Sequence, residues 1–126
     1  SIGAPSGTNI YNASDLRLKR NITTITDGLG KITALNPVKF NWIENYEPSE
    51  EGKDMLGFIA QEVKSIIPEA VEGFSSGGSI HVGDTIIDNP LRVNEKFIVP
   101  VLVKAIQEQQ ALINSLTDRI TALENK

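Results

Sequence analysis

A heptad repeat near the C-terminus constrains the fold more than any other feature of this sequence. Its core positions are separated by alternating steps of four and three residues and are Leu102, Ile106, Gln109, Ile113, Leu116, Ile120 and Leu123. This spacing places the side chains along one stripe of an α-helix and is typical of a coiled coil. We therefore expect residues 95–126 to form an oligomerisation helix. The alternative is a helix that packs on its own domain.

The residue types within the repeat carry further information. Isoleucine at the a positions and leucine at most d positions favour two-stranded parallel coiled coils. Gln109 is a polar interruption at a d position, which fixes register at some cost in stability. Pro100 removes one backbone hydrogen bond, which predicts a kink near residues 96–97. The repeat covers few heptads, so we expect it to continue a larger interface.

Composition excludes several kinds of site. The chain has 126 residues, enough for one domain, and no cysteine, which rules out disulfides and thiolate metal sites. The single histidine, His81, argues against a histidine metal site or a Ser-His-Asp triad. The net charge of −4 argues against nucleic acid as a partner, and no apolar run is long enough to cross a bilayer. We expect no metal, no cofactor, and neither a nucleic-acid nor a membrane partner.

Residues 15–94 carry the patterns of a small α+β domain with short strands and helices. Alternating apolar residues predict strands at 16–19 and 38–42. Asp27 is expected to cap a short helix that stops before Pro37. A second helix is expected to end at Pro68. Its apolar stripe contains Ile59, Val63, Ile66 and Ile67.

The remaining segments predict loops, one hairpin and a linker. Residues 44–54 are acidic and contain proline and glycine, so we expect a solvated loop. Residues 80–82 and 85–87 predict two short strands joined at Gly83-Asp84. Asn94 is expected to cap the final helix. Residues 1–14 are rich in Ser, Gly and Asn and are interpreted as the end of an upstream stalk or linker.

Ser14 and Lys19 lie at the border between this linker and the domain. A serine hydroxyl becomes a nucleophile when a base takes its proton, and lysine is such a base only if its pKa falls from about 10.4 to roughly 7–8. Burial or the neighbouring cations Arg17 and Arg20 could lower a lysine pKa in this way.

Geometry adds a constraint on this pair. Regular secondary structure does not bring together two side chains that are five residues apart. Either the chain turns sharply between Ser14 and Lys19, or the lysine of one protomer serves the serine of another. The alternative interpretation is that Ser14 or Asp15 caps a turn and Lys19 is an ordinary surface residue.

Four parts of the sequence together resemble a known family. They are Ser14-Asp15-x-Arg17-x-Lys19-x-x-Ile22, residues 34–42 (ALNPVKFNW), residues 57–63 (GFIAQEV) with 68–71 (PEAV), and residues 97–108 (FIVPVLVKAIQE). This set resembles the C-terminal intramolecular chaperone domain of phage endosialidases, tail fibres and neck-appendage spikes, which has a related form in myelin regulatory factor. The resemblance covers residues 14 to about 123.

The resemblance implies a homotrimer with a parallel trimeric coiled coil, in contrast to the two strands that the repeat favours. It implies a chaperone that aligns the upstream stalk of its own precursor and assists its folding. The domain would then cut itself off between Ser14 and Asp15 as a serine peptidase, with Ser14 as nucleophile and Lys19 as general base. Asp15 would become the new N-terminus, and its carboxylate would orient the site. Assembly would take place in the bacterial host cytoplasm, with the precursor in the virion tail and the chaperone released.

Alternatives to this scheme stay open in the sequence. The domain could remain on the fibre as a non-cleaving trimerisation and capping module. Residues 28–31 (GLGK) superficially resemble a phosphate-binding loop, which would suggest release driven by a nucleotide, but they lack its spacing and fit a helix start better. A serine that attacks its own carbonyl would form a strained four-membered ring. Cleavage would therefore need the serine of another protomer, an acyl shift at Ala13–Ser14, or a water activated by the Ser-Lys pair.

Overall fold

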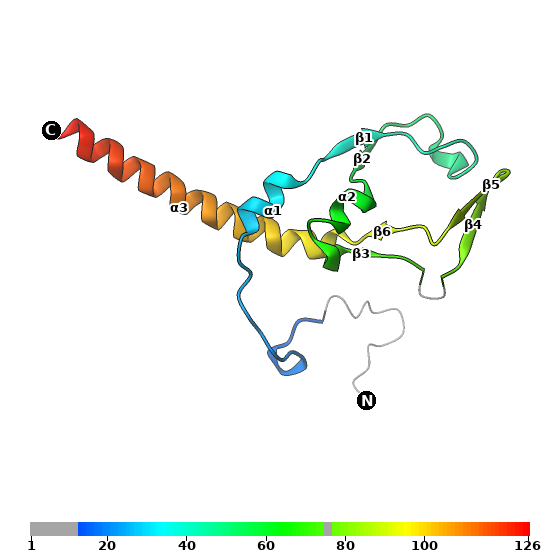
Figure 1. The fold of residues 1–126 in the computed structure, drawn as a ribbon, viewed down its shortest axis with the longest axis horizontal. Helices are drawn as coiled ribbons and strands as arrows, with labels where there is room; N and C mark the ends of the chain where they lie inside the picture. Colours follow the sequence, from blue (N-terminus) through cyan, green and yellow to red (C-terminus); the bar gives the residue numbers. More distant parts are fainter. Residues whose placement is uncertain (1–12, 75–76) are drawn as a thin grey trace.

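The computed structural model of the chain describes residues 13–74 and 77–126, so most of the predicted linker lies outside the described residues. Helix α3 (Ile98–Glu124) projects as a rod from one end of a small domain. The hairpin of β4 (Ser79–Val82) and β5 (Thr85–Asp88) lies at the opposite end (Figure 1). The predicted α+β class with a long C-terminal helix is confirmed. Among the described residues, no helix combines the length and apolarity needed to cross a bilayer.

The hydrophobic core lies between α2 (Ala60–Lys64), the turn that follows it, and the start of α3. Its buried members are Val63, Ile67, Ala70, Ile98 and Val101. Val63 and Ile67 therefore bury the stripe that was predicted for the second helix, whereas Ile59 lies just before α2 and is 42% exposed. The helix itself ends at Lys64, earlier than predicted, and a 3-10 turn begins at Pro68.

Helix α1 (Gly28–Ala34) packs against α3. Asp27 caps it as predicted, because its carboxylate accepts a hydrogen bond from the Gly30 amide at 3.2 Å. Gly28 is buried, and a Cβ atom at this position would lie 2.7 Å from Ala105 N and 2.8 Å from Val101 O. The glycine thus lets the two helix backbones approach closely. The GLGK segment is a helix start, as its sequence suggested.

The strands form three separate two-stranded antiparallel sheets rather than one larger sheet. Strand β1 (Val38–Phe40) pairs with β2 (Met55–Gly57), and β3 (Val71–Glu72) pairs with β6 (Arg92–Val93). The strand predicted at 38–42 is therefore present over its first part. The loop at 44–54 connects β1 to β2 and is mostly exposed, in agreement with prediction.

The predicted hairpin is present between β4 and β5, with Val82 opposite Thr85. Gly83 has a φ of +59° in the turn, a value that glycine adopts without steric cost. The predicted hairpin is therefore confirmed, because its turn chemistry was local.

The strand predicted at 16–19 is wrong, because this segment forms a 3-10 turn over Leu16–Leu18. The Asp15 carboxylate caps the turn by accepting a hydrogen bond from the Arg17 amide at 2.8 Å. Leu16 and Leu18 are 73% and 58% exposed, so their alternation with basic residues buries no face.

A second correction concerns the start of the final helix. Asn94 acts as the predicted cap, since its side chain accepts a hydrogen bond from the Lys96 amide at 3.1 Å. It caps a 3-10 turn (Glu95–Phe97) that leads into α3. Pro100 therefore lies in the first turn of α3, where backbone N–H groups have no partner within the helix. The hydrogen bond that Pro100 was predicted to remove does not exist there.

Candidate active site

The 3-10 turn brings the two predicted catalytic side chains of one chain together. Lys19 Nζ lies 2.6 Å from Ser14 Oγ, which is hydrogen-bonding distance. A lysine ammonium donates to the hydroxyl oxygen in this arrangement, and a neutral amine at the same distance can accept the hydroxyl proton. Of the two arrangements that the sequence left open, the chain adopts the sharp turn.

The backbone of the turn explains how residues five apart meet. The Leu18 amide donates to Asp15 O at 3.0 Å, and the Lys19 amide donates to Leu16 O at 3.1 Å. An extended chain would separate residues five apart by roughly 16 Å, at about 3.3 Å per residue. The turn removes this separation and leaves Ser14 and Lys19 at its two ends.

Arg17 holds Asp15 at the start of this turn. The Asp15 Oδ1 atom accepts hydrogen bonds from Arg17 N at 2.8 Å and from Arg17 Nε at 3.0 Å, while Arg17 Nη2 lies 2.9 Å from Oδ2. The guanidinium bonds, followed by the amide bond, hold the pKa of Asp15 below its ordinary value. Because the folded-state pKa is lowered, the carboxylate stabilises the turn at neutral pH, and this contribution is lost as the pH falls through the lowered pKa.

The Ser-Lys pair is open to solvent in the single chain. Every residue from Ala13 to Asp27 is exposed, and neither Ser14 nor Lys19 is covered by the core. The burial that the sequence hypothesis invoked is therefore absent from the single chain over its described residues. Any surface that shields the pair from water has to come from outside this set of residues.

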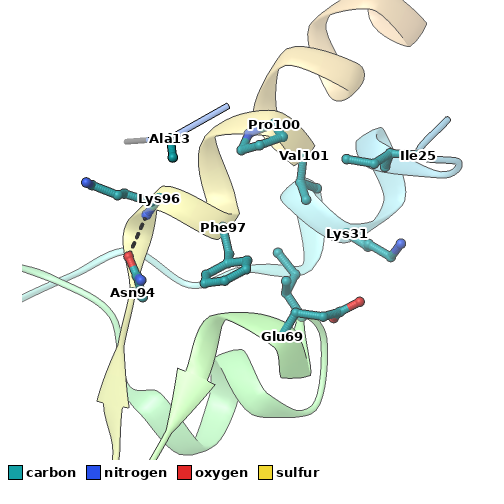
Figure 2. A pocket seen from close by; sticks show the side chains of 10 residues that line it. Ala13, Ile25, Lys31, Glu69, Asn94, Lys96, Phe97, Pro100 and Val101 are labelled. Carbon is teal, nitrogen blue, oxygen red and sulfur yellow. Dashed lines mark hydrogen bonds between the residues drawn. The ribbon is translucent and has the colours of Figure 1, made fainter. Parts of the chain in front are cut away.

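A cavity of about 480 Å³ adjoins the chain just before the turn. Figure 2 shows Ala13 near Phe97 and Lys96 at the start of α3, with Ile25 and Glu69 on other sides of the cavity. Ala13 directly precedes Ser14, so the cavity lies beside the upstream approach to the predicted cleavage site. The sequence gave no signal for it, because its walls come from four separate segments.

The predicted oligomerisation residues form an uncovered stripe along α3. Gln109 is exposed, and the apolar members are 43–63% exposed: Leu102, Ile106, Ile113, Leu116, Ile120 and Leu123. Val101 and Ala105, on a different face, are buried. The start of α3 thus packs on its own domain, while the heptad stripe is available to other chains.

Sequence reasoning missed the contact that joins α1 to the middle of α3. The Glu108 carboxylate accepts a hydrogen bond from the Leu29 amide at 2.7 Å. Leu29 lies in the first turn of α1, where such amides lack partners within the helix. The two residues are 79 positions apart, so no local pattern could have revealed the pair.

Comparison with known proteins bears on this geometry. Residues 14–72 match the model of a peptidase family described as the chaperone of endosialidase. The predicted resemblance is confirmed. The match to the chaperone of endosialidase begins at Ser14 and includes the whole turn and α1.

Long tail fibre proteins are similar to the chain over nearly its whole length. The long tail fiber protein Gp37 of Enterobacteria phage K3 is 29% identical over 120 residues, which cover 95% of this chain and 9% of that protein. The Gp37 of Enterobacteria phage T2 is also 29% identical over 120 residues, with 95% and 8% covered. The Gp37 of Enterobacteria phage Ox2 is 28% identical over 117 residues, with 92% and 43% covered.

The chain therefore spans less than half the length of each of these relatives. Together with the match to the chaperone of endosialidase, the relatives support a chaperone role in tail fibre assembly.

Proposed function

We propose that this chain is a homotrimeric intramolecular chaperone that aligns the upstream stalk of a phage tail fibre or tail spike and then releases itself at the Ser14–Asp15 bond. The observation that carries the peptidase part is the 2.6 Å contact between Lys19 Nζ and Ser14 Oγ. The family match and the tail fibre relatives support the chaperone part. The domain proper begins at Asp15, and residues 1–14 are the end of the stalk.

Trimerisation is supported by the exposed heptad stripe of α3. Ile113 and Ile120 are 48% and 55% exposed, and burying apolar area of this kind favours association by about 25 cal/mol per Å². Aligning three chains at one end removes much of the search entropy from a stalk with many long-range contacts. Removing the aligner afterwards leaves a stalk whose durability is kinetic, because the opened chains do not readily refold.

The chemistry needs a neutral lysine amine. Lys19 takes the hydroxyl proton of Ser14 while Oγ adds to the carbonyl carbon of the scissile bond. The C–N bond then breaks, and the departing Asp15 nitrogen takes the proton from the lysine ammonium. Water hydrolyses the resulting ester and restores the hydroxyl.

The carbonyl that is attacked belongs to a neighbouring chain in this proposal. Attack by Ser14 on its own carbonyl would close a four-membered ring, so the serine and lysine of one chain act together on the Ser14–Asp15 bond of another. Association would also cover the exposed pair, which strengthens electrostatic interactions by excluding water. Cleavage is thereby tied to assembly.

A mass measurement on chains with about a hundred residues of natural upstream stalk tests the proposal. Wild type should yield a fragment that begins at Asp15, identified by N-terminal sequencing. Both Ser14→Ala and Lys19→Ala should stay whole, with cleavage at least about a thousandfold slower. Identical masses for all three proteins would refute the peptidase and leave a trimerisation and capping module that stays on the fibre.

Mixed trimers test which chain supplies each group. When Ser14→Ala chains with a distinguishing tag assemble with wild-type chains, the tagged chains should be cut by their neighbours. When Ser14→Ala chains assemble with Lys19→Ala chains, no chain holds a complete pair and none should be cut. Cleavage in this second mixture would mean that the lysine acts across the interface.

The capping module has one observation in its favour. The turn is explained by the Asp15 cap alone, and both Ser14 and Lys19 are exposed in the single chain. A module of this kind would form the trimer but leave the precursor whole. The mass measurement separates the two functions, since only the peptidase depends on Ser14.

A further inference from the structure

We propose that Arg17 is a positioning residue of the self-cleaving site, because it holds the Asp15 carboxylate away from Lys19 and leaves the lysine amine to Ser14. The inference rests on the proposed function. It assigns a role to a residue that touches neither Ser14 nor Lys19 in the described contacts.

Asp15 has a choice of cations on this turn. It is the only acidic residue between Ala13 and Thr26, where the basic residues are Arg17, Lys19 and Arg20. Arg17 takes both carboxylate oxygens, with Nε 3.0 Å from Oδ1 and Nη2 2.9 Å from Oδ2. This fork geometry is stronger and more directional than a single ammonium contact.

Lys19 is consequently bonded to a neutral partner. Its Nζ lies 2.6 Å from Ser14 Oγ, whereas Asp15 is occupied by the guanidinium and by the Arg17 amide. Lys19 lies four residues after Asp15 on a tight turn, within reach of its carboxylate if Arg17 were absent. A carboxylate beside the ammonium would favour the charged form, and that form cannot accept the hydroxyl proton.

Cleavage measured against pH tests this role in the full chain with its upstream stalk. Arg17→Gln should move the rising limb of the rate profile to higher pH and slow cleavage about threefold to tenfold at pH 7, with recovery at alkaline pH. In an Asp15→Asn background, Arg17→Gln should produce no further alkaline shift. Arg20→Gln is the matched control, because it removes a cation next to Lys19 without releasing Asp15, and its shift should be smaller.

Two outcomes would overturn the inference. A merely structural role for Arg17 would lower the rate equally at every pH, with no alkaline shift. A shift of the same size in the Asp15→Asn background would show that Arg17 acts without the carboxylate. Partial recovery of the profile by Arg17→Lys would support the role, because lysine offers one of the two side-chain contacts.

A readout without cleavage separates failure of this inference from failure of the proposed function. The ¹⁵N signal of the Lys19 side chain is followed against pH in the uncut Ser14→Ala chain. Adding Arg17→Gln should move this titration to higher pH, and adding Asp15→Asn as well should reverse the move. If wild type never cleaves, the peptidase fails, and this titration still decides whether Arg17 keeps Asp15 from Lys19. No change on adding Arg17→Gln would refute the inference.

Discussion

The two halves of helix α3 face different environments. In the first half, Val101 and Ala105 are 6% and 3% exposed, and both lie where α1 crosses the helix. From Gln109 to the end, every residue is exposed, including the apolar heptad positions. The first half is completed by contacts within one chain, and the second half has an apolar stripe that only another molecule can cover.

This difference separates two kinds of stability. Contacts within a chain fix a free energy of unfolding that does not depend on concentration, whereas contacts between chains add a term that does. Glu108 lies at the border, where its carboxylate still binds the Leu29 amide of α1. We therefore expect variants on either side of this border to affect different measurements.

The largest effect is expected from a charge in the heptad stripe. Ile113→Asp would place a carboxylate at the centre of the proposed trimer in each of three copies, where an unpaired charge loses its hydration. The dissociation constant should rise at least about 100-fold, measured by analytical ultracentrifugation. Ser115→Asp is the control, because it adds the same charge outside the stripe. Equal effects of the two variants would break the comparison.

A second variant tests the packed half of the helix. A Cβ atom at Gly28 would lie 2.7 Å from Ala105 N, so Gly28→Ala forces α1 away from α3. The overpacking costs about 1–3 kcal/mol of unfolding free energy, more than the gain of at most about 1 kcal/mol from helix propensity. Thermal denaturation at several concentrations should show the loss at each one. A stabilised Gly28→Ala protein would contradict the close approach of the two backbones.

The smallest effect is expected at the border itself. Glu108→Ala removes the acceptor for the Leu29 amide and should lower the free energy of unfolding by about 1 kcal/mol. Hydrogen exchange of the Leu29 amide should become faster, while association through the stripe stays intact. Gln107→Ala, at an exposed neighbouring position, should change neither quantity. Unaltered exchange at Leu29 in Glu108→Ala would mean that the contact does not protect it.

Local chemistry predicted several elements correctly. The caps at Asp27 and Asn94 and the hairpin turn at Gly83 depend on residues within a few positions, which a sequence displays directly. The strand expected at Leu16 failed for the same kind of reason. Its alternation was real, but the Asp15 side chain offered the backbone a turn, and no partner strand among the described residues paired with the segment.

The sequence by itself determined the residue types, the heptad spacing and the order of short elements, because these follow from side-chain chemistry and chain periodicity. Only the tertiary structure decided that α1 crosses α3 at Gly28, that Glu108 binds Leu29, and that the cavity beside Ala13 exists. These features join residues far apart in the chain, and their geometry depends on how the elements pack. The contact between Ser14 and Lys19 lies between the two cases: the residues are near in sequence, but it took the turn capped by Asp15 to bring them together.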